Sequence, residues 1–227
     1  MEKILVAAAY GVFAVFVIRF LAYWLIWRKT VVRLRMTAER VRLGAKALAL
    51  SVMDVFFFGR LLMVNPALWV GEWVFHVSFL LVVLRHLRFF LNPVPSCIWW
   101  VQTPGLIAGY FLPLSLVYVL VVRLLTKRER YASPANVFLL ALVLVISSFG
   151  VLMQWVFTPD LVNAKLFILG ILSFAPVSPP ESTLFAIHFS LVLVLIPFLP
   201  NHIFFAPVVM MEARKREQTL HLVMHEK

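Results

Sequence analysis

The hydrophobic pattern of this chain consists of five long apolar runs separated by shorter polar or basic stretches. A membrane-spanning α-helix needs about 20 consecutive, predominantly apolar residues. Each run reaches that length and contains few charged residues. The pattern therefore predicts five transmembrane helices, at about residues 4–27, 66–91, 104–125, 134–157 and 183–206.

Two further apolar stretches are too short to span a membrane. The connection at 28–65 is basic in its first half and apolar around 55–58 and 61–64, which favours a position along the membrane surface or beneath a partner. Residues 166–174 precede a proline-rich stretch, so we expect a short interfacial or re-entrant helix there. With the basic tail at 207–227, these segments form one membrane domain over residues 1–227.

Composition supports a membrane protein. Hydrophobic residues make up 63% of the chain, charged residues 14%, and the mean hydropathy is +0.97, which excludes a soluble globular domain. Cys97 is the single cysteine, so the chain offers no cysteine set for an iron–sulfur cluster, a disulfide or a c-type haem. We therefore expect an all-α integral membrane protein, and any iron–sulfur cluster belongs to a partner.

Basic residues indicate the orientation. Most of the 21 lysines and arginines follow the first, third or fifth span, and the positive-inside rule places that side in the cytoplasm, with the N-terminus outside and the C-terminus inside. The net charge of +11 then follows from topology and anionic lipid, and nucleic acid is not an expected partner. The basic segments 28–46 and 123–130 are expected to form much of a docking surface for a cytoplasmic partner.

Four histidines lie inside the apolar runs as two pairs, His76 with His86 and His188 with His202. A ring that titrates near neutral pH is costly in hydrocarbon unless its nitrogen has a partner. Haem iron is a suitable partner because neutral imidazole is a good axial ligand. The pattern therefore favours two bis-histidine haems over helix–helix hydrogen bonding or a proton relay.

The spacing supports this interpretation. On a helix, ten residues from His76 to His86 rise about 15 Å and turn the second side chain only about 80° from the first. Fourteen residues from His188 to His202 rise about 21 Å and return to within about 40° of the same face. Antiparallel helices would pair His86 with His188 near the outer surface and His76 with His202 near the inner one.

Several charged residues accompany the histidines. Arg85 and Arg88 flank His86 and suit haem propionates or a quinone oxygen, although snorkelling to headgroups is the alternative. Arg19 in the first span either snorkels or meets an inner propionate. Glu72 could orient His76 or be an interface carboxylate. The less specific candidates are Asp54 with Arg60 as a loop pair, Asp160 with Lys165 beside a quinone pocket, His221 with His225 as a solvated tail, and Pro197 with Pro200 as bends before His202.

These residues resemble the gamma (cytochrome b) subunit family of respiratory nitrate reductase. The stretch FHVSFLLVVLRHLRFF carries His76 and His86 at the family's spacing, and HFSLVLVLIPFLPNHIFFAPV resembles its fifth helix. The segment RHLRFF followed by NPVP is similar to the membrane cytochrome of the dissimilatory sulfite reductase-associated, heterodisulfide-reductase-like branch. The interval from His188 to His202 is about one helical turn shorter than in nitrate reductase relatives.

The resemblance implies a dihaem b-type cytochrome subunit of a respiratory complex in a prokaryotic cytoplasmic membrane. Such a subunit would transfer electrons between menaquinol or menaquinone and a cytoplasmic iron–sulfur subunit, either heterodisulfide-reductase-like or nitrate-reductase-beta-like. Two haem b groups would be held by His86 with His188 and by His76 with His202. The alternative is a haem-free membrane anchor or a transporter that uses histidine proton relays.

Overall fold

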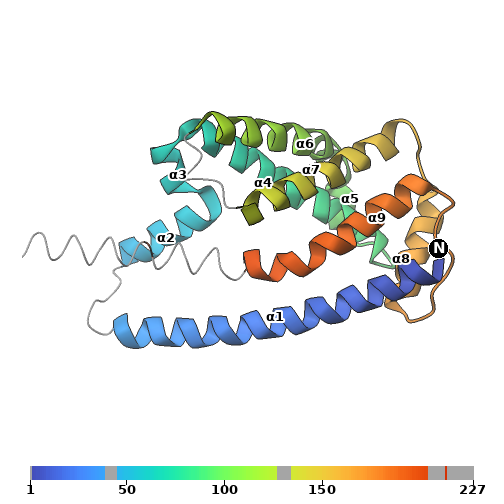
Figure 1. Cartoon of the computed structure of the whole chain (residues 1–227), viewed down its shortest axis with the longest axis horizontal. Coiled ribbons are helices and arrows are strands. Elements are labelled where there is room, and N and C mark those ends of the chain that lie inside the picture. Colours follow the sequence, from blue (N-terminus) through green and yellow to red (C-terminus); the bar gives the residue numbers. More distant parts are fainter. Residues whose placement is uncertain (1, 39–44, 127–133, 204–212, 214–227) are drawn as a thin grey trace, which may run out of the picture. The chain divides into compact units, whose positions relative to one another are not determined.

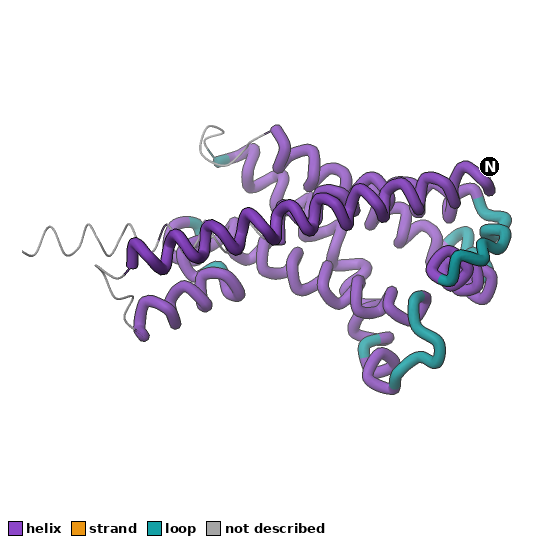
Figure 2. The backbone as a smooth tube through the Cα atoms, turned by 90° about the horizontal axis from the view of Figure 1, so that it is seen from below, coloured by secondary structure: helices purple, strands orange, loops and turns teal. Residues whose placement is uncertain are grey.

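The computed structural model describes residues 2–38, 45–126, 134–203 and 213. Figure 2 shows these segments as helices joined by loops, with no strand among them. The elements are α1 (Glu2–Ala38), α2 (Ala45–Phe57), α3 (Gly59–Val64), α4 (Pro66–His86), η1 (Leu87–Phe89), α5 (Ser96–Trp100), α6 (Gln102–Leu125), α7 (Pro134–Trp155), α8 (Leu161–Leu172), α9 (Thr183–Leu195) and η3 (Ile196–Phe198).

The described helices include five that are long and apolar enough to cross a membrane, which confirms the predicted all-α, five-helix membrane fold. Their ends agree with the expected spans to within a few residues, and the last part of the fifth expected span, 204–206, lies outside the described residues. Proline starts α4 and α7, where its missing N–H costs nothing. The five segments are Lys3–Lys29, Pro66–Phe89, Gln102–Leu125, Pro134–Trp155 and Thr183–Ile203.

The chain divides into two compact units, and each is described by itself. The first unit combines Met1–Phe13 with Ala67–Ile196 and contains α4 to α9. Within it α6 packs on α7, α7 packs on α9, and the short helix α8 lies against η1 (Figure 1). The second unit combines Ala14–Pro66 with Pro197–Lys227 and contains α2 and α3.

Close approach of α4 and α6 shapes the first unit. A Cβ atom added to Gly105 on α6 would lie 2.8 Å from Arg85 Cβ and 2.9 Å from the Leu81 carbonyl oxygen of α4. A Cβ added to Gly71 on α4 would meet the Tyr118 ring at 2.6 Å. Small residues of this kind let helix backbones approach closely in a membrane, where packing replaces the hydrophobic effect as the force between helices. The contact fixes the end of α4 that carries Arg85.

Capping side chains position the helices at the α8 end of the first unit. Asp160 accepts hydrogen bonds from the backbone N–H groups of Val162 (2.8 Å) and Asn163 (3.2 Å) at the start of α8, and Ser182 accepts one from Phe185 N–H (3.3 Å) at the start of α9. Such caps satisfy N–H groups that have no partner within the helix. The short helix expected at 166–174 is confirmed, although it begins earlier, at Leu161.

The connection expected at 28–65 is largely helical. Helix α1 continues beyond the apolar run to Ala38, because the residues after Trp27 include no glycine or proline that would end a helix. Asp54, expected in a loop with Arg60, lies inside α2, is buried, and accepts a hydrogen bond from the Arg60 backbone N–H at 3.1 Å. The basic stretches 39–44 and 127–133 and the tail at 214–227, with His221 and His225, lie outside the described residues.

Candidate functional site

A cavity of about 600 Å³ lies within the first unit. It is bordered by the N-terminal part of α1, the end of α4, and residues of α7, α8 and α9. Its lining is mainly apolar, and its volume falls in the range of about 300–1,000 Å³ that is usual for small-molecule and cofactor sites. The polar side chains along it are Tyr10, Arg85, His86, Arg88, Gln154, Thr158 and His188.

Two of the four predicted ligands border this cavity, His86 from α4 and His188 from α9. The Nδ1 atom of His86 lies 2.7 Å from the Val82 carbonyl oxygen, and that of His188 lies 3.1 Å from the Ile146 carbonyl oxygen on α7. A neutral imidazole whose Nδ1–H donates to a carbonyl carries its lone pair on Nε2. Both rings therefore have the tautomer that binds a metal through Nε2, as ligating histidines usually do.

Gly150 leaves room beside one of these rings. It lies on α7 and lines the cavity, and a Cβ atom there would lie 3.5 Å from His188 Cε1. That distance is an ordinary van der Waals contact, so an alanine would fit but would already touch the imidazole. A longer side chain at this position would extend into the cavity.

The two arginines predicted to bind a cofactor also border the cavity, and each bonds to a neutral amide. Arg88 Nη1 donates to Gln102 Oε1 at 2.8 Å, and Arg85 Nη1 lies 3.5 Å from Gln154 Oε1. The Nε atom of each guanidinium is buried and has no hydrogen-bond partner among the residues that the structure describes. The arginines therefore retain donor capacity for a further ligand.

One side of the cavity is formed by contacts between α1 and the end of α8. The Tyr10 hydroxyl donates to the Ile171 carbonyl oxygen at 3.1 Å, and the Tyr10 ring stacks on Phe174 at 5.5 Å between centroids. Phe174 has a positive φ of 58°, which turns the chain sharply after α8. These contacts place two aromatic side chains along one side of the cavity.

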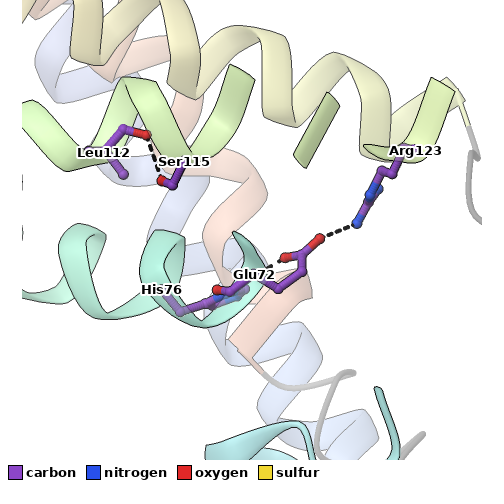
Figure 3. Close-up of polar contacts among 5 residues, drawn as sticks. All are labelled: Glu72, His76, Leu112, Ser115 and Arg123. Carbon is purple, nitrogen blue, oxygen red and sulfur yellow. Dashed lines mark hydrogen bonds and ion pairs between the residues drawn. The ribbon is translucent and has the colours of Figure 1, made fainter. Parts of the chain in front are cut away.

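His76 lies on the same continuous helix as His86 but does not line the cavity. Its Nδ1 atom lies 2.7 Å from the Glu72 carbonyl oxygen and 3.8 Å from the Glu72 carboxylate. The Glu72 carboxylate points to α6, where it pairs with Arg123 at 2.6 Å (Figure 3). Glu72 is therefore an interface carboxylate that also lies beside His76. The geometry is compatible with both roles predicted for it, orienting His76 and pairing at a helix interface.

The other two predicted site residues belong to the second unit. Arg19 lies 3.4 Å from the Tyr23 hydroxyl through its Nη2 atom and 5.9 Å above the Tyr23 ring. His202 follows the 3₁₀ turn η3, which interrupts the helix at Pro197. Neither residue is among those that line the cavity, and their roles as cofactor ligands stay predictions. Among the weaker candidates, Asp160 caps α8, and neither it nor Lys165 lines the cavity.

The sequence interpretation missed three residues that line the cavity, Gly150, Gln154 and Tyr10, and it missed Gln102, which accepts a hydrogen bond from Arg88. The two glutamines carried a usable signal, because an amide in an apolar span needs a partner much as a histidine does. No feature of the sequence pointed to Gly150 or Tyr10, since their roles depend on contacts between helices far apart in sequence. No group of three histidine, cysteine or acidic side chains gathers as a metal site within the described residues, whereas an axial haem site takes two histidines.

Two curated proteins are similar to this chain, both named Hdr-like menaquinol oxidoreductase cytochrome b-like subunit. The one from Archaeoglobus profundus is 34% identical over 149 residues, which cover 59% of this chain and 44% of the relative. The one from Archaeoglobus fulgidus is 31% identical over 163 residues, which cover 62% of this chain and 49% of the relative. No family model and no solved structure matches.

The matched regions span less than half the length of either relative. Together with the five apolar helices, these relatives support the expected multi-pass protein of a prokaryotic membrane. The resemblance expected from the histidine-bearing stretches is also confirmed, because this chain is similar to cytochrome b-like subunits of the Hdr-like menaquinol oxidoreductase type.

Proposed function

We propose that this chain is the membrane cytochrome b subunit of a quinone-linked oxidoreductase complex and that its first unit binds a haem b. One observation carries the proposal: His86 and His188, from α4 and α9, border one apolar cavity, and the Nδ1 of each faces a backbone carbonyl. That arrangement leaves two Nε2 lone pairs available at a single cavity. The names of the two similar proteins support the same class.

The residues present fit a haem. The cavity volume of about 600 Å³ suits a cofactor of that size class, the apolar wall suits a macrocycle, and the buried guanidinium atoms of Arg85 and Arg88 suit its carboxylates. Haem b supplies reversible one-electron chemistry when bound. His86 and His188 would hold it, with their carbonyl bonds to Val82 and Ile146 fixing the ring orientation.

The other lining residues would determine the environment of that site. Tyr10 and Phe174 line one side, and aromatic and aliphatic side chains of α8 and α9 make most of the remaining wall apolar. A dry apolar surround and nearby cations both influence the reduction potential of a ligated iron. We infer that this unit provides ligation, orientation and electrostatic tuning.

We further propose that the complex exchanges electrons between menaquinol and an iron–sulfur subunit. The similar proteins are named menaquinol oxidoreductase subunits, and a chain with one cysteine cannot build a four-cysteine cluster itself. With the orientation expected from the basic segments, the partner would dock on the cytoplasmic side. His76 and His202 remain the predicted ligands of a second haem b on the basis of their spacing in the sequence.

A reduced-minus-oxidised spectrum of the purified full-length chain, with pyridine haemochrome quantitation, tests this proposal directly. We expect b-type bands and two haems per chain. One haem would retain the site at His86 and His188 and remove the second pair from the proposal. Absence of reducible b-type bands after reconstitution with haem would overturn the function and favour a haem-free anchor or transporter.

Gly150 provides a test of where the haem lies. Gly150→Leu should weaken haem retention by roughly tenfold or more, since overpacking a filled site costs about 1–3 kcal/mol. Gly150→Ala should retain haem, because its Cβ would make only an ordinary contact with His188. The measurement is haem per chain after gel filtration. Gly109→Leu on α6 is the matched control, because nothing lies within 4 Å of a Cβ there, and full haem occupancy in Gly150→Leu would contradict the placement.

A further inference from the structure

Arg85 and Arg88 place two positive charges on the wall of the cavity, on either side of His86 in sequence. Within the described part of the chain, neither guanidinium pairs with a carboxylate. Their polar contacts are the glutamine amides of Gln154 and Gln102, together with the Phe89 ring, 4.8 Å from the Arg88 guanidinium carbon. The first unit thus has a local excess of two positive charges facing its cavity.

This excess is costly in the absence of a ligand. Both arginines lie inside or at the end of the second apolar span, and their Nε atoms are buried without a hydrogen-bond partner in the described segments. A buried donor that lacks a partner destabilises the folded chain, and more so when the group is charged. Two like charges in close sequence also repel each other in a low-dielectric setting. An anionic ligand at this edge of the cavity would relieve both costs.

The number of positive charges at the cavity indicates which kind of anion would bind there. A quinone is neutral and would leave both charges uncompensated, whereas a ligand edge with two carboxylates would balance them. Arg is well suited to that task because its planar fork of donors matches a carboxylate. Gln102 and Gln154 hold the guanidiniums through Nη1 only, so the remaining donors stay available to the ligand.

We propose that Arg85 and Arg88 form a two-armed carboxylate clamp, positioned by Gln154 and Gln102, which binds the two propionates of the haem held by His86 and His188. This rests on the proposed function and adds to it the edge of the macrocycle that the chain recognises. Gln102 and Gln154 are positioning residues that act through the arginines. The clamp orients the macrocycle, since both carboxylates must lie at the Arg85 and Arg88 edge of the cavity.

A ligand comparison tests the clamp. The full-length haem-free chain is titrated with haem b and with haem b dimethyl ester, whose propionates are neutral, and the dissociation constants are read from the b-type absorption bands. The wild-type chain should bind the free acid more tightly than the ester, by about tenfold or more, because hydrogen bonds between two charged groups are stronger than those to a neutral ester. Arg85→Gln with Arg88→Gln should lose that preference while still binding the ester through histidine.

Three further variants test whether the preference depends on Gln102 and on the charges at the cavity. Gln102→Glu would give Arg88 a carboxylate of its own, so it should reduce the preference for the free acid, whereas Gln102→Leu should reduce it less. Lys3→Gln removes an exposed positive charge that does not line the cavity and should leave the preference unchanged. The double arginine variant should also have a more negative midpoint potential, because removal of nearby cations favours the oxidised iron.

The outcomes separate the clamp from the proposed function. Equal affinity of the wild-type chain for haem b and its ester would overturn the clamp and leave haem binding intact. A preference that survives in the double arginine variant would overturn it as well. Failure of the wild-type chain to bind either ligand, with no b-type bands, would refute the proposed function itself.

Discussion

Replacing His86 by alanine is expected to remove one of the two proposed haems and to leave the chain folded. His86 borders the cavity, and its Nδ1 bond goes to Val82 in its own helix, so the substitution deletes a proposed ligand without removing a hydrogen bond between helices. Loss of an axial ligand removes the main attachment of a haem b. Pyridine haemochrome quantitation should therefore give about half the wild-type haem content per chain, and reduction by menaquinol should be lost.

Two companion variants separate ligand loss from a general defect. Ser148→Ala removes a similar bond within one helix, from the Ser148 hydroxyl to the Leu144 carbonyl oxygen at 2.8 Å, and should keep both haems. His86→Gly supplied with free imidazole should recover the lost spectrum, because the added ring can enter the space left at the cavity. Retention of both haems in His86→Ala would show that His86 does not ligate haem.

The positions of the spans could be predicted closely from the sequence, because the length of an apolar run and the thickness of a bilayer determine where a helix enters the membrane. The residue at which α1 ends could not be predicted from the sequence. Hydropathy falls after Trp27, yet the helix continues to Ala38, because the charged residues that leave the membrane are as compatible with a helix as the apolar ones before them. The end of an apolar run and the end of a helix are therefore determined by different features of the sequence.

The placement of His76 and His86 on one helix was predictable, because spacing along a helix is local geometry and α4 is continuous from His76 to His86. The same argument was weaker for His202. It assumed an unbroken α-helix from His188, whereas the 3₁₀ turn η3 at Ile196–Phe198 changes the rise and rotation per residue before His202 is reached. Pro197 is the local cause, because it cannot donate the backbone hydrogen bond that an α-helix needs at that position.

The partners of the arginines could not be predicted, because they come from other helices. Gln154 lies on α7 and Gln102 at the start of α6, and only the packing of the bundle brings them to Arg85 and Arg88. The sequence suggested either propionates or a quinone oxygen as the ligand of these cations. Counting the charges around the cavity favours the propionates, and that count required the structure.

The Glu72–Arg123 pair should have a large effect on stability. It joins α4 to α6 at 2.6 Å, with 10% of the Glu72 side chain and 17% of the Arg123 side chain exposed. Removing one member of a buried pair costs roughly 3–5 kcal/mol, whereas replacing both by apolar groups is often neutral or stabilising. Thermal unfolding in detergent should therefore show that Glu72→Leu and Arg123→Leu each lower the Tm sharply, while the double variant recovers most of the loss.

The same variants decide between the two readings of Glu72. The Nδ1 atom of His76 already lies 2.7 Å from the Glu72 backbone carbonyl, whereas the carboxylate is 3.8 Å away. Because a side-chain substitution leaves that carbonyl in place, we expect the double variant to recover stability and to keep the wild-type haem content and spectrum. Recovery of the Tm together with loss of one haem would instead show that the carboxylate orients His76 as a ligand. Additive losses in the double variant would show that the two charges do not stabilise the interface as a pair.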